Sequence, residues 1–232
     1  MKIPEWQDIT VEMYQHIYGI NKSDMSDIDK FLFTITFLTN KTEAEIDKIS
    51  LRTYKSLEKQ LVNIFTQLLE PKGEPSTELQ GLEVIYDFKY MTLGRYIEIQ
   101  HFIKSGMEVN LHMIGASITK GLTHSERADI ISEGPFLPTM LSVAYFMKEF
   151  AKFTLQYKGL FGIDDDSDEV KPTGDFNERY GWIFSAKEVS IHEGIPLDAA
   201  FDLPVIQAFN DLAYLKSFQQ YQNELNKKNE KL

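Results

Sequence analysis

The segment Pro135 to Lys158 is the most apolar stretch of the chain and constrains its fold more than any other. Large apolar side chains recur in it at steps of three and four residues, which is the spacing of one face of an α-helix. Phe146, Phe150 and Phe153 are neighbours on that face. The uncharged part ends at Met147 and is too short to cross a bilayer. The spacing therefore predicts the central helix of a soluble helical core.

Four helices are predicted in residues 1–70, which we interpret as an N-terminal helical unit. Their apolar residues share one face, and residues that favour helix N-termini stand near their starts. The clearest start signal is Thr42, which opens a capping-box pattern with Glu45 three residues later. We expect the four helices at residues 6–18, 28–38, 42–49 and 54–69.

Residues 71–90 differ in composition and predict a loop with a β-hairpin. The stretch from Glu70 to Gly81 holds two prolines and two glycines, which is typical of a loop. Leu82 to Tyr90 alternates in part and is rich in β-branched and aromatic residues, so it predicts a strand. Because a single strand needs a partner, we expect a small hairpin with Glu78 to Gln80.

The pattern of the first unit recurs in residues 91–158, which we interpret as a second unit of four helices. Thr92 takes the place of Thr10, and Phe136 falls opposite Tyr54, at an offset of about 81 to 82 residues. An internal duplication and a chance similarity between amphipathic helices both explain this pattern, and they stay open as alternatives.

Residues 159–175 are interpreted as an acidic linker, and residues 176–232 as C-terminal helices. Glycines, a proline and an acidic run mark the linker. Apolar spacing then predicts a helix over 176–189, a short turn over 195–203 and a last helix that starts at Pro204. The expected fold is mainly α: a helical bundle with two four-helix units, a small β-hairpin between them and a C-terminal helical segment.

The chain carries 24 basic and 35 acidic residues, which gives a formal net charge of −11. Its average field repels phosphate backbones and anionic lipid, so we expect neither a nucleic-acid nor a membrane partner. The absence of cysteine excludes disulfides, thiolate chemistry and cysteine-based metal sites. The first residues lack the apolar core of a signal peptide, which predicts a location in the cytoplasm of the cell that makes the protein.

The sequence predicts no metal site and no cofactor. Asp164, Asp166, Asp168 and Asp175 have part of the spacing of a calcium loop, but Glu169 stands where that loop needs glycine. A solvated linker explains the same residues. The five histidines are never four positions apart, so a helical zinc pair is not expected. They stand at positions 16, 101, 112, 124 and 192, and the one at 112 is interpreted as a core residue with satisfied hydrogen bonds.

No catalytic residues are predicted, and we expect a protein without enzymatic activity. The chain has no Gly-x-Ser-x-Gly elbow and no phosphate-binding glycine motif. Ser142 lies in the middle of the apolar helix, where its hydroxyl is expected to bond back to that helix. Carboxylate pairs such as Glu126 and Asp129 are interpreted as partners of a helix dipole.

Hydrophobic and aromatic side chains are the candidates for contacts with other proteins. Leu160 and Phe161 stand beside the acidic run, either as a docking spot or as a cover over the end of the core. The last helix changes from apolar to rich in Gln and Asn, which suits pairing with another helix, while a frayed, solvated end is the alternative. Its candidate partner-binding residues are Phe209, Tyr214, Phe218 and Tyr221. Tyr180 and Trp182 are interpreted as core anchors rather than interface residues.

Several stretches of the chain together resemble a viral family. They are WQDITVEMYQHI, LTNKTEAEIDKISLRTYKSL and MTLGRYIEI, followed after the acidic linker by YGWIFSAKEVSIHEGIPLDAAFDLPVIQAFNDLAYLKS. This order is similar to helical proteins encoded among the virion-assembly genes of tailed bacteriophages, especially those of Bacteroidetes hosts. Those proteins are described as tail assembly chaperones or as structural proteins of undescribed role.

The resemblance implies a non-enzymatic role in building a virus particle. Tail assembly chaperones coat the long tape-measure protein until tail-tube subunits assemble. The implied partners are therefore tape-measure or tail-tube proteins, with self-association as an alternative, in the cytoplasm of the bacterial host. A structural protein of the mature virion, in the neck, at the capsid or packaged, is the first alternative. The second alternative is an acidic metal-binding or regulatory module, which only the acidic linker supports.

Overall fold

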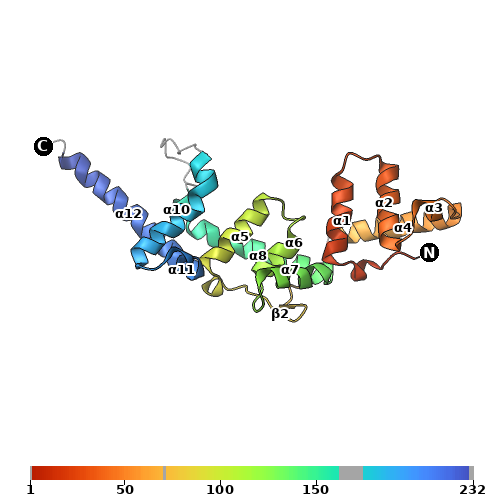
Figure 1. Ribbon diagram of the computed structural model, residues 1–232, viewed down its shortest axis with the longest axis horizontal. Coiled ribbons are helices and arrows are strands. Elements are labelled where there is room, and N and C mark those ends of the chain that lie inside the picture. Colours follow the sequence, from red (N-terminus) through yellow and green to blue (C-terminus); the bar gives the residue numbers. More distant parts are fainter. Residues whose placement is uncertain (1, 70–71, 162–174, 230–232) are drawn as a thin grey trace. The chain divides into compact units, whose positions relative to one another are not determined.

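The computed structural model describes residues 2–69, 72–161 and 175–229, and helices dominate these residues (Figure 1). Twelve α-helices, two short 3-10 helices and one two-stranded hairpin form within them. The predicted mainly α fold with a small β-hairpin is confirmed. The acidic residues Asp164, Asp166 and Asp168 lie outside the described residues.

Contacts divide the chain into two compact units that interleave along the sequence. Unit 1 comprises Met1–Val84 and His101–Phe146, and unit 2 comprises Ile85–Gln100 and Met147–Leu232. This division differs from the consecutive units expected at residues 1–70 and 91–158. Helices α5 (Leu93–Lys104) and α8 (Phe136–Gln156) contribute residues to both units.

Unit 1 joins an N-terminal set of helices to a later helix pair. Its helices include η1 (Trp6–Asp8), α1 (Val11–Lys22), α2 (Asp27–Thr39), α3 (Glu43–Ile46), α4 (Leu51–Leu69), α6 (Leu111–Ser117) and α7 (His124–Glu133). The hairpin pairs β1 (Glu78–Leu79) with β2 (Leu82–Glu83) in antiparallel register. The capping box predicted at Thr42 forms, with the Glu45 carboxylate accepting the Thr42 N–H at 2.9 Å.

Unit 2 is built around the C-terminal helices. The helices of this unit include η2 (Phe88–Tyr90), α9 (Lys158–Phe161), α10 (Asp175–Glu193), α11 (Leu197–Asp202) and α12 (Val205–Asn229). Helix α10 packs against both α11 and α12. The last helix was predicted to start at Pro204, and α12 starts one residue later, at Val205.

The strand predicted over Leu82 to Tyr90 is wrong beyond Glu83. Val84 pairs with Thr119 only as an isolated bridge. The Asp87 carboxylate then accepts the Lys89 N–H at 3.0 Å, and the chain turns into η2. A short side chain that bonds to nearby backbone offers the chain an alternative to a strand ladder.

The Ser142 hydroxyl also differs from expectation, because it bonds across the unit rather than to its own helix. The Ser76 N–H donates to Ser142 Oγ at 3.0 Å, and Ser142 Oγ in turn lies 3.4 Å from the Ser76 carbonyl. Ser142 is fully buried. The hydroxyl thus ties the segment before β1 to α8 across 66 positions of sequence.

A threonine–proline bridge recurs in the two units. Thr10 and Pro135 form an isolated antiparallel bridge in unit 1, and Thr92 and Pro204 form another in unit 2. In each bridge, the residue that follows the threonine donates its N–H to the carbonyl of the residue that precedes the proline. The residue that follows the proline donates its N–H to the carbonyl of the residue that precedes the threonine. These N···O distances are 2.8 to 3.0 Å. Both threonine hydroxyls accept the N–H of the residue three positions later. Thr92 and Pro204 thus take in the bridge of unit 2 the places that Thr10 and Pro135 have in the bridge of unit 1.

Replacing Ser142 by alanine is expected to lower the free energy of unfolding by about 1–2 kcal/mol, because a buried two-point hydrogen bond is lost. Urea unfolding followed by circular dichroism measures this change. Ser185→Ala is the matched control, since its hydroxyl donates to the Gly181 carbonyl of its own helix at 2.9 Å. An equal loss in both variants would contradict the bridging role of Ser142.

Candidate functional site

The predicted partner-binding residues separate into buried and exposed ones. Phe209 is fully buried and packs in a cluster of rings, so it offers no surface to a partner. Tyr214, Phe218 and Tyr221 are exposed on α12. Leu160 is half-buried in α9, and the side chain of Phe161 lies outside the described residues. That the exposed residues bind a partner stays a prediction.

Helix α12 is held at its start and exposed at its end. In its first half, the Tyr157 hydroxyl donates to Asn210 Oδ1 at 3.0 Å, and Lys216 Nζ, at the point where the arm begins, donates to the Gly159 carbonyl. Every residue from Lys216 to Asn229 is exposed. Figure 1 shows this part of α12 running beyond its neighbours in unit 2. The helix therefore joins a packed base to a solvent-facing arm.

The arm carries one line of apolar side chains, which we call the α12 seam. It consists of Tyr214, Phe218, Tyr221 and Leu225, whose exposed fractions are 57%, 44%, 57% and 40%. Their spacing of four, three and four residues is that of a coiled-coil contact line. The rings of Tyr214 and Phe218 stack with centroids 6.0 Å apart. Leu225 completes the seam and was not among the residues predicted to bind a partner.

Of the two residues predicted to anchor α10 in the core, Tyr180 and Trp182, only Trp182 does so. Trp182 is half-buried, and its ring lies 5.6 Å from that of Tyr96, which confirms its core role. Tyr180 is 49% exposed, so its assignment to the core is wrong. Residues two positions apart point to nearly opposite sides of an α-helix, so only one of the two could face the core, and their shared aromatic character does not tell which one. Ile183, Phe184 and Ile191 are exposed on the same helix.

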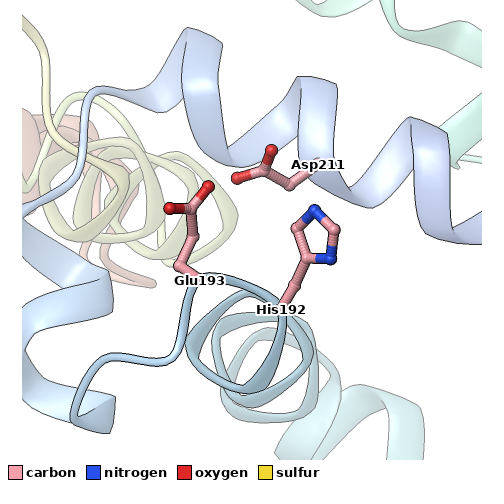
Figure 2. Close-up of side chains that lie close together, drawn as sticks. All are labelled: His192, Glu193 and Asp211. Carbon is pink, nitrogen blue, oxygen red and sulfur yellow. The ribbon is translucent and has the colours of Figure 1, made fainter.

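Three side chains of potential metal ligands meet where α10 ends against α12, and we call them the 192–193–211 cluster. His192 and Glu193 are the last residues of α10, and Asp211 lies in the second turn of α12. One ligand atom from each lies within 4.8 Å of the others. Figure 2 shows the two carboxylates and the imidazole directed toward one another. No other such group of three occurs within residues 2–69, 72–161 and 175–229.

The electrostatics of this cluster are unfavourable for a bare carboxylate at Asp211. Burial raises the pKa of Asp211, the adjacent Glu193 carboxylate raises it further, and the charge of His192 opposes the shift. Asp211 Oδ2 is buried and has no hydrogen-bond partner among the described residues. Glu193 Oε1 accepts a hydrogen bond from Gln207 Nε2 at 3.3 Å. The cluster can therefore share a proton or hold a cation.

Sequence reasoning missed this cluster because its members belong to two helices. The search for zinc ligands tested spacings within one helix, and neither Glu193 nor Asp211 lies at such a spacing from His192. A turn of the chain through α11 brings α10 and α12 together, and no local pattern encodes that contact. The signal that existed was a lone Asp at position 211 within the apolar start of α12.

His112 is half-buried, and its ring makes the hydrogen bond that the sequence predicted for a residue of the core. Its Nδ1 lies 2.9 Å from Gln15 Nε2, which also donates to the Val109 carbonyl at 2.8 Å. The second bond fixes the amide orientation, so the ring accepts at Nδ1. Burial lowers the pKa of His112 below its ordinary value of 6.5, and the charge of His124 lowers it further, against a smaller opposing effect of Asp129.

Comparisons with protein-family models, with curated proteins and with solved structures find no match to this chain. None of the helices in residues 2–69, 72–161 and 175–229 has the length and apolar character needed to cross a membrane.

Because His112 has a lowered pKa in the folded state, the unfolded chain binds its proton more tightly, and stability falls as the pH drops below about 6.5. His112→Gln should reduce this acid loss, since glutamine also accepts the Gln15 N–H without charging. The loss of stability is measured as the fall in Tm between about pH 7 and pH 5. His101→Gln, which removes an exposed imidazole of the same unit, is the control, and an equal effect there would exclude a specific role of His112.

Proposed function

We propose that this chain is a non-enzymatic morphogenesis protein of a tailed bacteriophage that acts through protein–protein contacts, in the manner of a tail assembly chaperone. The observation that carries the proposal is the α12 seam, a line of exposed aromatic and aliphatic side chains on a helix with a packed base. Exposed apolar lines of this kind are costly in water and mark contact surfaces. The sequence resemblance supplies the biological setting.

The geometry of the seam favours a helix as its partner. Apolar positions spaced by four and three residues lie along one face of a helix, and such a line packs against the matching line of a second helix in a coiled coil. The positions beside the seam are Gln219, Gln220, Gln222 and Asn223, which stay hydrated at the edges of such a contact. Helix-in-groove recognition reads apolar anchors at this spacing. A long helical tape-measure protein presents such faces in series.

The charge of the arm favours an acidic partner surface. Residues 212–229 carry Lys216, Lys227 and Lys228 against one acidic residue, Glu224. The chain as a whole has a net charge of −11, so this local excess of positive charge is a departure from its average. Complementary charge beside an apolar contact speeds association and selects among partners.

A structural protein of the mature virion is the first alternative, because the same seam would serve a permanent contact. An acidic metal-binding or regulatory module is the second. Mass spectrometry of purified particles separates the first two: a chaperone is absent from them, and a structural protein is present in fixed copy number. A tape-measure gene next to this one would favour the chaperone.

The double variant Tyr214→Gln/Phe218→Gln is expected to weaken binding of the neighbouring tape-measure product by about 30-fold or more, because the loss of even one buried aromatic anchor costs about 2 kcal/mol. Glutamine keeps the helix propensity, so α12 stays helical. Co-expression followed by quantitative affinity purification and calorimetry measures the loss.

Phe33→Gln is the matched control, since Phe33 is 46% exposed on α2 of unit 1 and lies outside the seam. It should bind like the wild type. Light scattering of the purified chain tests self-association through the seam. A dimer that the double variant abolishes, together with no tape-measure binding, would contradict the chaperone role.

A further inference from the structure

We propose that the 192–193–211 cluster is a zinc site that fastens the base of α12 to the end of α10. His192 supplies an imidazole nitrogen, and Glu193 and Asp211 supply carboxylate oxygens. All three belong to unit 2 and come from two packed helices. This proposal does not depend on the identity of any protein partner.

The donor set fits a zinc-class ion better than a hard cation. Imidazole nitrogen and carboxylate oxygen are both zinc ligands, and with a water these three groups complete a tetrahedral site, whereas calcium and magnesium prefer six or more oxygen ligands. At bond lengths of about 2.1 Å, tetrahedral ligand atoms lie about 3.4 Å apart. The ligand atoms here lie within 4.8 Å of one another. His192 and Glu193 are exposed and can close this difference by rotation of their side chains.

Asp211 gives the reason why a cation is needed there. Its Oδ2 atom is buried and lacks a hydrogen-bond partner among the described residues, while the Glu193 carboxylate lies beside it. A buried acceptor that is left without a partner costs free energy, and a second negative charge adds to this cost. A divalent cation between the two carboxylates removes both costs at once.

The end of α10 adds to the attraction for a cation. His192 and Glu193 occupy its last turn, where the carbonyl groups give the helix a partial negative charge. Within unit 2, this places the helix end, two carboxylates and an imidazole around one point (Figure 2). The His192 ring also lies 5.6 Å from the ring of Tyr214, the first residue of the α12 seam. Metal binding would therefore fix the point from which the seam extends.

The test is titration of the chelator-treated full chain with Zn²⁺, followed by calorimetry and thermal unfolding. We expect one ion per chain. The Tm should rise by about 5–10 °C at a free zinc concentration about a hundredfold above Kd. Co²⁺ should give the visible absorption of a tetrahedral site. Absence of stoichiometric binding would overturn the proposal.

Two variants separate a built site from weak surface binding. His192→Gln should lose the Tm shift, and its exposed position makes a folding defect unexpected. Asp211→Asn should lose the shift too, yet it should raise the Tm of the metal-free protein because it removes a carboxylate that faces Glu193. Substitution of a residue with a purely structural role would not both abolish the Tm shift caused by zinc and raise the Tm of the metal-free protein.

Asp198→Asn, an exposed acid in α11 of the same unit, and His101→Ala are the matched controls and should bind zinc like the wild type. If all variants and controls bind alike, the ion is held by scattered surface groups and the proposal fails. If Asp211→Asn stabilises the protein but the wild type binds no zinc, the two carboxylates share a proton instead, and the proposal fails as well.

Discussion

The packing of aromatic rings around Tyr96 holds unit 2 together. The Tyr96 ring stacks on Phe150 with centroids 4.7 Å apart and meets Phe209 edge-on at 4.9 Å. Such pairs contribute about 0.5–1.5 kcal/mol each beyond the burial of their surface. The Tyr96 hydroxyl is satisfied by Thr154 at 3.1 Å and by Gln100 at 3.1 Å, so its burial leaves no polar group unpaired. Helices α5, α8 and α12 meet in this cluster.

This cluster explains why a single helix can be both core and arm. Phe209 anchors the first turns of α12, and from Lys216 onward the helix has no buried residue. Residues 205–229 contain neither glycine nor proline, so nothing in the backbone ends the helix where the core ends. A helix that continues past its core must meet water or another chain with the same set of side chains. The α12 seam is therefore exposed because α12 continues past the core and because its sequence keeps apolar side chains there.

Local features of this chain were predictable, and contacts between distant segments were not. The capping box at Thr42 and the apolar spacing of α8 are encoded within a few residues, and both predictions agree with the structure. The bond between Ser76 and Ser142 joins elements that no local pattern relates. Phe209 and Tyr214 illustrate the same limit within one helix: periodicity places both on apolar lines, but only tertiary packing decides which line has a neighbour.

Asp211 stands at the boundary between the two parts of α12, and its position links the cluster to the seam. It precedes Tyr214 by three residues and Phe218 by seven, so it continues the seam toward the core as a polar residue. A polar residue on such a line limits how far a partner helix can pair and fixes its register, at a cost in stability. If a cation offsets that cost, the first turn of the seam is held before any partner arrives. A partner then loses less conformational entropy on binding, because the surface it meets is already ordered.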